Sequence, residues 1–319
     1  MNLFKTINSE IEIKENIDKN LKLFRDFDQT SFYLDEGAEV FYSGSTTQKT
    51  VKKINIEESV KILEKLISQK NKKIAFISLG AGNSSKETPI LDELHNKGYD
   101  FAYFGVDCSM SMLELSEQVL KDSKFEKHLI CADFASSVFK KEIHELVGDF
   151  DIRIFMMLGN TFGNVPQSYM ADTLKKMVQK NDFLWLEINR LEEYSEIEAS
   201  KNFEKAMAYL EDPTNKTFLT YPLTSKKISL DYGELTLEMV KDNSLESINF
   251  KFGFSFEKKF NLKFNDHEMT FLPNESIDLL SIRTYYLPTL IEFIKERDFE
   301  FIEEVVVENM AGVFFKKYN

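Results

Sequence analysis

Hydrophobic and polar residues follow one another in blocks that switch between the period of a helix and that of a buried strand. Between residues 54 and 69, Val60, Ile62, Leu63 and Leu66 recur at helical spacing, which predicts an amphipathic helix. Short apolar runs then alternate with further helical patterns as far as residue 188. This order predicts βαβ units, and so a parallel sheet with helices on both faces. The expected strands are 74–79, 100–106, 127–131, 151–158 and 183–188, and the expected helices between them are 86–97, 109–120, 136–146 and 168–178.

The pattern changes after residue 190. Residues 192–210 are typical of a helix, whereas 228–264 alternate apolar and polar residues as strands do. The second block predicts an antiparallel meander in a separate, smaller α+β lobe. Near the end of the chain, 287–297 predict a helix, and 299–307 and 311–317 predict two final strands. The expected fold class is therefore α/β, a doubly wound sheet with a second lobe.

Two glycines one residue apart follow the first expected strand. Gly80 and Gly82 tolerate positive φ and let the backbone come close to a ligand. The polar residues 83–85 can then begin a helix, whose free N–H groups favour an anionic or carboxylate-bearing ligand. A glycine pair after a strand is equally typical of a plain tight turn. The ends of the neighbouring strands decide between the two interpretations.

Each of the next three strands also ends in residues suited to binding, and ligands of doubly wound sheets bind at such carboxyl ends. Asp107 follows the second strand and can accept hydrogen bonds from two ribose hydroxyls. Asp133 and Phe134 follow the third, where they can bind an exocyclic amine and pack against a purine. The loop 159–164 follows the fourth and offers small residues and two amides. Together these features predict a pocket for a cofactor that joins a nucleoside to an amino acid.

Each of these features also has a purely structural interpretation. Asp107 and Asp133 can cap the helices that follow them, because aspartate favours such positions. Glycine and asparagine in 159–164 are typical of a simple turn. The predicted pocket therefore depends on all four features occurring together at the strand ends.

Composition disfavours several classes of function. The chain has 319 residues, enough for one large domain with a smaller second one, and its net charge of −13 disfavours nucleic acid and anionic membranes as partners. Two cysteines, Cys108 and Cys131, are too few for a disulfide framework, and four histidines form no metal-ligand pattern. Residues 1–20 lack the apolar stretch of a signal peptide, and no apolar run is long enough for a membrane span. We expect a cytoplasmic protein.

The order of these strand-end features resembles class I S-adenosylmethionine-dependent methyltransferases. More narrowly, the chain resembles the histidine-specific, ergothioneine-type methyltransferases. The resemblance covers about residues 30–190 and, more faintly, 275–319. It is carried by four segments: the loop 79–86 with its two serines and Lys86, the pair Asp133-Phe134, the Leu-Gly-Asn-Thr-Phe-Gly-Asn stretch 158–164, and the Phe-Tyr-Leu-Asp-Glu-Gly stretch from Phe32 that continues to Phe41.

The resemblance implies a Rossmann-like methyltransferase sheet and a division of the chain. Residues 56–190 and 275–319 would form the cofactor-binding core, and 1–55 with 191–274 would form a lobe that covers a small-molecule substrate. Taken with the strand-end reasoning above, the residues expected to bind S-adenosylmethionine are Gly80, Ala81, Gly82, Lys86, Asp107, Asp133, Phe134 and Gly159. The residues expected on the substrate side are Tyr33, Asn160, Asn164 and Arg283.

The chain departs from the family pattern at two functional positions. Ser78 stands where many methyltransferases have an acid just before the glycine loop. If Ser281 and Arg283 match the serine and the basic residue of the family's substrate segment, Leu279 replaces the glutamate that holds the substrate's amino group. Asp278 is adjacent, but neighbouring strand residues point to opposite faces. These departures disfavour histidine as the methyl acceptor.

The expected function is N-methylation of an amino acid or a related small amine. In-line transfer to a neutral amine depends on orientation and exclusion of water more than on a general base, so we assign no catalytic acid or base and no metal. The alternative is a methyltransferase-like module that holds the cofactor without efficient catalysis. A nicotinamide-dependent oxidoreductase is disfavoured because Ser85 stands where G-x-G-x-x-G has its third glycine.

Overall fold

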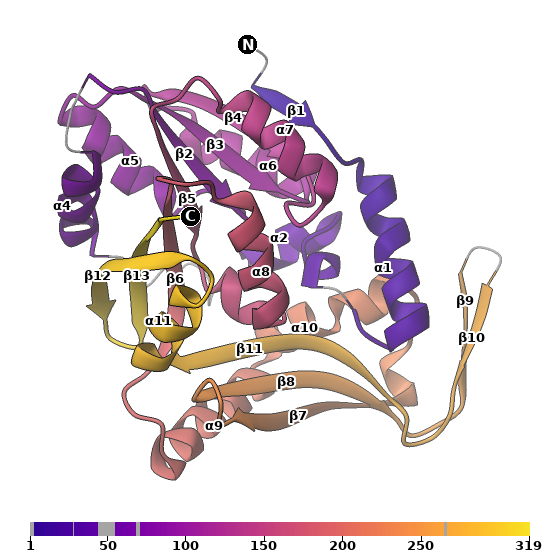
Figure 1. Cartoon of the computed structure of the whole chain (residues 1–319). Helices are drawn as coiled ribbons and strands as arrows, with labels where there is room; N and C mark the ends of the chain where they lie inside the picture. Colours follow the sequence, from indigo (N-terminus) through magenta and orange to yellow (C-terminus); the bar gives the residue numbers. More distant parts are fainter. Residues whose placement is uncertain (1–2, 28, 44–54, 68–70, 265–266) are drawn as a thin grey trace.

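A mixed sheet forms the centre of the molecule. The computed structural model describes residues 3–27, 29–43, 55–67, 71–264 and 267–319, and Figure 1 shows its elements. The described residues form an eleven-stranded sheet in which β1, β4, β3, β2, β5, β6, β11, β8 and β7 are consecutive neighbours. Strand β13 joins this sheet at β6 and carries β12 on its other side.

The parallel part of the sheet has the strands predicted from the sequence. Every residue of β2 is buried, because β2 lies between β3 and β5 with helices on both sides of the sheet. The continuous apolar run is thus the signature of a central parallel strand. The five strands are β4 (Glu126–Cys131), β3 (Phe101–Asp107), β2 (Ile74–Leu79), β5 (Ile152–Met157) and β6 (Phe183–Leu191).

Six helices cover the parallel strands, and each buries an apolar face against the sheet. Phe139 and Leu174 belong to the apolar cluster on one face, and Leu63 and Leu113 to the cluster on the other. Ser109 and Ser136 cap the helices after β3 and β4, in place of Asp107 and Asp133, which the sequence offered as possible caps. One face carries α4 (Ile56–Ile67), α5 (Glu87–Asn96) and α6 (Met110–Leu120), and the other carries α7 (Ser137–Leu146), α8 (Gln167–Met177) and α11 (Leu287–Lys295).

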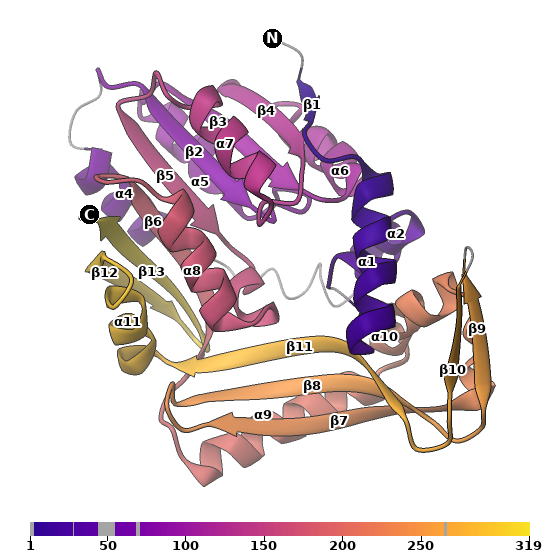
Figure 2. The ribbon, with the colours of Figure 1, turned by 45° about the vertical axis from the view of Figure 1, so that its right-hand side comes forward.

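The predicted meander is present, but it continues the core sheet. Strand β11 pairs antiparallel with β8, and β8 pairs antiparallel with β7. At its end β11 also pairs in parallel with β6, because Asn189 to Leu191 extend β6 beyond its pairing with β5. The meander that we predict for a separate lobe therefore shares one continuous sheet with the core. The strands are β7 (Gly233–Asp242), β8 (Ser247–Phe256) and β11 (Ser276–Tyr286), and the hairpin of β9 (Phe260–Phe264) and β10 (His267–Phe271) projects from them in Figure 2.

Helices pack on the meander and form a second apolar core. Phe250, Phe252 and Phe254 of β8 lie in this core with Leu219 of α10 and Ile17 of α1. The sequence pattern predicted α9 but assigned no element to α1 or α10. The helices are α1 (Glu10–Phe24), α9 (Glu196–Glu211) and α10 (Pro213–Ser225), followed by the short turn η3 (Leu230–Tyr232).

The two ends of the chain both join the core sheet. At the C-terminus β12 (Phe299–Val307) and β13 (Met310–Lys317) form the predicted hairpin, and β13 pairs antiparallel with β6. At the N-terminus β1 (Phe4–Thr6) pairs in parallel with β4. The sequence reasoning had placed all of residues 1–55 in the covering lobe, so β1 is an exception to that division. The segment Phe32 to Phe41 lies at the end of η1 (Gln29–Phe32) and in α2 (Glu36–Ser43).

The start of α10 yields a prediction about stability. Asp212 accepts hydrogen bonds from the backbone N–H groups of Thr214 (2.9 Å) and Asn215 (3.0 Å). We expect Asp212→Ala to lower the free energy of unfolding by about 1 kcal/mol, because two N–H groups lose their acceptor. The exposed neighbour Glu211 is the control, and Glu211→Ala should change it by less than about 0.5 kcal/mol. Denaturant unfolding of both variants measures the difference, and equal stabilities would contradict the capping role.

Candidate functional site

The glycine loop turns sharply over the end of β3. The N–H groups of Gly80 and Ala81 both donate to the carbonyl oxygen of Val106, at 2.9 Å each. Gly80 (φ 71°) and Gly82 (φ 53°) adopt left-handed conformations that favour glycine. A Cβ atom at Gly80 would lie 3.0 Å from Thr161 and 3.7 Å from the Phe134 ring. The absence of a side chain at Gly80 thus lets Thr161, from the loop after β5, lie close to the glycine loop.

Asp107 fastens the glycine loop to the end of β3. It is 7% exposed, and its Oδ2 accepts from the Gly82 N–H at 2.8 Å while its Oδ1 accepts from the Ser109 N–H at 3.0 Å. Ser109, and not Asp107, is the residue that caps α6. Burial raises the pKa of the Asp107 carboxyl, and these backbone hydrogen bonds oppose the shift. Because a carboxylate has about four lone-pair positions, Asp107 can still accept hydroxyl hydrogen bonds.

The N-terminal segment reaches the loops after β3 and β4. Asn8 Oδ1 accepts hydrogen bonds from the Asp133 N–H (3.3 Å) and the Ser136 hydroxyl (3.1 Å), and Glu10 Oε1 accepts from the Met110 N–H (2.9 Å). Asp133 Oδ1 also accepts from the N–H of residue 135 at 2.9 Å, while Ser136 caps α7. Phe134 is half-buried and packs against the apolar core, with its ring near Gly80. The structure thus brings the predicted Asp133-Phe134 pair to the glycine loop.

Glu187 is a residue of this region that the sequence reasoning missed. It comes from β6, is almost fully buried, and forms an ion pair with Lys86 through Oε2. The same oxygen accepts from the Gly159 N–H at 2.6 Å, and the Glu187 carbonyl accepts from the Asn160 N–H at 3.2 Å. Glu187 therefore joins the glycine-loop lysine to the loop after β5. The signal in the sequence is that Glu187 is an acid in the middle of a strand whose neighbouring residues are apolar.

The loop after β5 also reaches β11. Asn160 is buried in a left-handed conformation, and its Oδ1 accepts from the Asn189 N–H at 2.9 Å. Its Nδ2 donates to Asn164 Oδ1 and to the Arg283 carbonyl, both at 3.4 Å. Three of the four residues predicted on the substrate side thus lie together. The side-chain amide of Asn160 uses its hydrogen bonds to hold Asn164 and the Arg283 backbone in place.

Arg283 is a cation in partial burial. Its Nη1 donates to the Val165 carbonyl at 2.7 Å, and burial lowers the pKa of its guanidinium. Within the described part of the chain, no Asp or Glu forms an ion pair with it. Asp242, whose charge acts on it, is hydrogen-bonded to Gln167 and Ser244. Buried atoms without a described hydrogen-bond partner occur nearby in β8 and β11, namely Asn249 Oδ1 and the Tyr285 hydroxyl.

Tyr33, the fourth residue predicted on the substrate side, packs against the second apolar core. Its ring packs against Phe41 (centroids 5.1 Å apart) and Phe218 (5.9 Å). Burial raises the pKa of the Tyr33 hydroxyl, and the charges of Asp107 and Cys108 raise it further. Tyr33 is therefore close enough to the end of β3 for these charges to act on it.

The segment that differs from the family pattern is apolar in this chain. Leu279 is buried in the second core, at a bulge in β11 between Asp278 and Leu280. Asp278 is exposed, and its backbone pairs with Arg25 and Phe27. Neither position directs a buried carboxylate at the group around Arg283.

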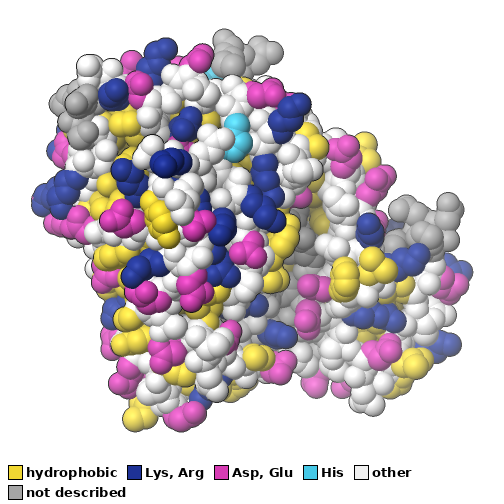
Figure 3. Space-filling model, in the orientation of Figure 1, with side chains coloured by type: hydrophobic (Ala, Val, Ile, Leu, Met, Phe, Trp, Pro, Cys, Tyr) yellow, Lys and Arg dark blue, Asp and Glu magenta, His cyan; other side chains and the backbone are white. Residues whose placement is uncertain are grey.

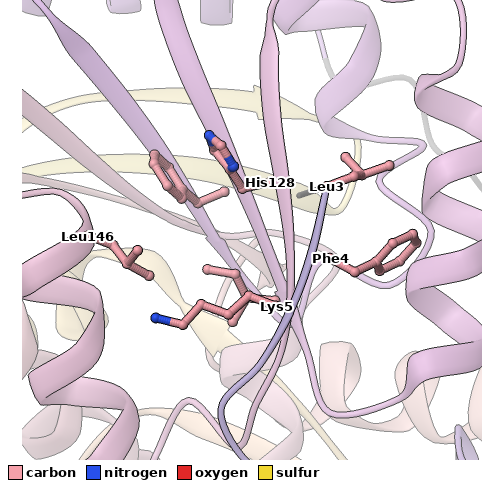
Figure 4. A pocket seen from close by; sticks show the side chains of 7 residues that line it. Leu3, Phe4, Lys5, His128 and Leu146 are labelled. Carbon is pink, nitrogen blue, oxygen red and sulfur yellow. The ribbon is translucent and has the colours of Figure 1, made fainter. Parts of the chain in front are cut away.

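A cavity of about 260 Å³ lies away from these residues (Figure 4). It is enclosed by β1, β3, β4 and α7, where the His128 ring stacks on Phe104 at 4.8 Å and Lys5 pairs with Glu142. Its lining residues are Leu3, Phe4, Lys5, Phe104, His128, Ile130 and Leu146. None of the predicted site residues is among them.

Other observations concern partners and metals. On the face in Figure 3, Lys and Arg are interspersed with Asp and Glu among the described side chains. The described residues contain no group of three His, Cys, Asp or Glu side chains placed to hold a metal ion, and both cysteines are free thiols. In the same residues no helix is both long and apolar enough to cross a membrane. A cytoplasmic location stays a prediction.

The fold and the strand-end residues together define a class of enzyme. A parallel sheet with a glycine loop after β2 and acids at the ends of β3 and β4 is the Rossmann-like core of class I methyltransferases. A model of the family described as histidine-specific, SAM-dependent methyltransferases matches residues 13–304, and the chain belongs to this family. It is therefore an S-adenosylmethionine-dependent methyltransferase, as its motifs predicted.

Solved structures similar to the chain are also methyltransferases. One is an S-adenosylmethionine-dependent methyltransferase from Clostridium acetobutylicum (12% identity, 96% of this chain and 99% of that chain covered, TM-score 0.37). Another is the CurJ carbon methyltransferase (12% identity, 96% and 71% covered, TM-score 0.45). A third is human N-acetylserotonin methyltransferase in complex with SAM (10% identity, 98% and 63% covered, TM-score 0.45). No curated protein matches this chain.

The contacts of Glu187 predict a local change in backbone protection. We expect Glu187→Ala to accelerate hydrogen exchange of the Gly159 amide, because that N–H loses the carboxylate oxygen that accepts from it at 2.6 Å. The amides of Gly80 and Ala81 donate to Val106 and serve as internal controls whose exchange should not change. Exchange measured by mass spectrometry or NMR tests this. Equal acceleration at all three amides would indicate general destabilisation instead.

Proposed function

We propose that this methyltransferase transfers a methyl group to the nitrogen of an amino acid or a related small amine. The observation that carries the proposal is Arg283, a half-buried guanidinium without a described carboxylate partner beside Asn160 and Asn164. Four of its N–H groups remain after the hydrogen bond to Val165, and a guanidinium binds a carboxylate in a bidentate manner. An acceptor with a carboxylate next to its amine fits this group.

The residues present fit S-adenosylmethionine as the donor. In our proposal Lys86 binds the methionine carboxylate, Asp107 accepts from the ribose hydroxyls, and Asp133 accepts from the adenine amine. Phe134 packs against the purine, and Gly80, Ala81, Gly82 and Gly159 leave the backbone open to the ligand. The close approach of Thr161 and Phe134 to Gly80 supports this assignment, because the loops after β4 and β5 then lie beside the glycine loop.

The chemistry requires orientation rather than proton transfer by the protein. The donor, when bound, supplies a sulfonium-activated methyl group. Arg283, Asn164 and Tyr33 would hold the acceptor so that its neutral amine faces the donor, and Asn160 keeps Asn164 and β11 in place. A general base is unnecessary for an amine that is already neutral. The burial of Leu279 and the exposure of Asp278 support an acceptor other than histidine.

We also propose a division of labour within the chain. Residues 56–190 and 275–319 would bind the donor, and 191–274 with most of 1–55 would cover the acceptor. Strand β1 is the exception, because it completes the core sheet beside β4.

Ligand-dependent stability tests the donor site. S-adenosylmethionine and S-adenosylhomocysteine should stabilise the protein by roughly 2.7 kcal/mol at a hundredfold excess over Kd, whereas NAD should not. Asp107→Ala should abolish this stabilisation with a modest effect on the free protein. Asp100→Ala, at the exposed start of the same strand, is the matched control. Thermal shift measurements distinguish the outcomes, and stabilisation by NAD alone would contradict the donor assignment.

Steady-state kinetics test the acceptor side, after a mass-spectrometric screen of amino acids and amines has identified a methylated product. We expect Arg283→Gln to raise KM for a carboxylate-bearing acceptor about 10- to 100-fold, the equivalent of roughly 1.5–3 kcal/mol. The affinity of the Arg283→Gln variant for S-adenosylmethionine should equal that of the wild type. The decarboxylated form of the same acceptor is the matched control, because it should be equally poor with both proteins. If Arg283→Gln impairs both acceptors equally, the carboxylate assignment is wrong.

A further inference from the structure

A buried acid lies directly beneath the glycine loop. Ser78, the fully buried residue near the end of β2, donates its hydroxyl to Glu87 Oε1 at 2.6 Å. This distance is in the range of charge-assisted hydrogen bonds. Glu87 is the first residue of α5 and is only 3% exposed. The end of the strand therefore reaches a carboxylate that comes from the helix after the loop.

Other hydroxyl groups complete this buried cluster. The Ser84 hydroxyl, within the loop, is hydrogen-bonded to the Tyr103 hydroxyl (2.8 Å) and to the Ser116 hydroxyl (2.5 Å). Ser84 has a left-handed backbone and is itself fully buried. The loop is thus anchored from beneath by polar groups of β2, β3, α5 and α6.

The charges around Glu87 do not balance. The ionisable groups that face it are Lys86 on its own helix, Glu187 from β6 and Tyr103 from β3. Lys86 is already paired with Glu187. Among the described residues, no Lys, Arg or His forms an ion pair with Glu87 or with Asp107, the other buried acid of the loop. Glu87 and Glu187 therefore share the one ammonium group of Lys86, and Asp107 is a further buried carboxylate without an ion-pair partner among the described residues.

This excess of negative charge is complementary to the donor. S-adenosylmethionine carries two positive groups, its ammonium and its sulfonium, and one carboxylate, which Lys86 would bind. We propose that Glu87 is the buried counter-charge for the positive groups of the donor, and that through Ser78 it positions the start of the glycine loop in place of the acid missing at residue 78. This inference rests on the proposed donor site. Glu87 acts here as a positioning residue.

The proposal has a consequence for pH dependence. Burial raises the pKa of Glu87 to about 7. A positively charged ligand favours the ionised carboxylate, so binding lowers this pKa and releases a proton, and affinity rises as pH rises through 7. In the free protein the sign is opposite. A folded-state pKa above the unfolded value means that ionising Glu87 destabilises the free fold as pH rises through 7.

The isosteric change Glu87→Gln separates these effects. It keeps an acceptor for Ser78 but removes the buried charge, so the free protein should be at least as stable as the wild type at neutral pH. Its affinity for S-adenosylmethionine should fall about tenfold, equivalent to roughly 1.4 kcal/mol. Proton release on binding, measured by calorimetry in two buffers between about pH 6 and 8, should decrease. The exposed Glu93→Gln on the same helix is the control for net charge.

A double variant tests whether the buried carboxylate can act from residue 78 as well as from residue 87. Ser78→Glu with Glu87→Ser returns the carboxylate to the strand, and we expect it to recover most of the lost affinity. If Glu87→Gln binds the donor as the wild type does, with unchanged proton release, the counter-charge role is overturned. Lower stability together with unchanged affinity would make Glu87 a purely structural residue. If the wild type itself does not bind S-adenosylmethionine, the donor site is wrong, and this inference falls with it.

Discussion

The candidate site depends on the contacts that the Glu187 carboxylate makes with Lys86 and Gly159. Its Oε2 atom binds Lys86 and accepts from the Gly159 N–H, so two loops that follow different strands meet at one atom. Because Glu187 is buried, loss of Lys86 would leave a poorly solvated charge, so breaking this ion pair is costly. The same short loop continues to Asn160, which reaches Arg283 in β11. The residues that we propose for the donor and for the acceptor are therefore linked through the contacts of one side chain.

Strand β6 gives this contact its place in the fold. It pairs with β5 on one side and with β13 on the other, and its last residues pair with β11. The sheet branches there, because Asn189 to Leu191 extend β6 beyond its pairing with β5 and are free to pair with β11. Asn160 closes the branch point by accepting from the Asn189 N–H and donating to the Arg283 carbonyl. The loop after β5 is thus tied to both arms of the sheet.

The sequence predicted what depends on local pattern. The core strands and helices followed from periodicity, and Ser109 and Ser136 marked helix starts correctly. Helix α1 also has a sequence signal, the capping box of Ser9 and Glu12. Helix α10 has a weak helical signal in the sequence, because Pro222 lies inside it. The residues that we expect in the donor site belong to short sequence motifs, so the sequence alone predicts them. The strands that they follow end at one edge of the sheet. Glu87 and Glu187 could not be assigned, because their partners lie far away in sequence or across a loop.

The junction between β6 and β11 bears on how such a chain can diversify. Leu191, where the chain leaves β6, pairs with Tyr286, where it returns from the meander into α11. The departure and return points are therefore neighbours on the same rung. Everything between them is topologically an insertion at one position of the core. Residues 192–274 can change in length and sequence while the spacing of the core strands stays the same. Under the proposed division of the chain, new acceptors could thus be accommodated without rebuilding the part that would bind the donor.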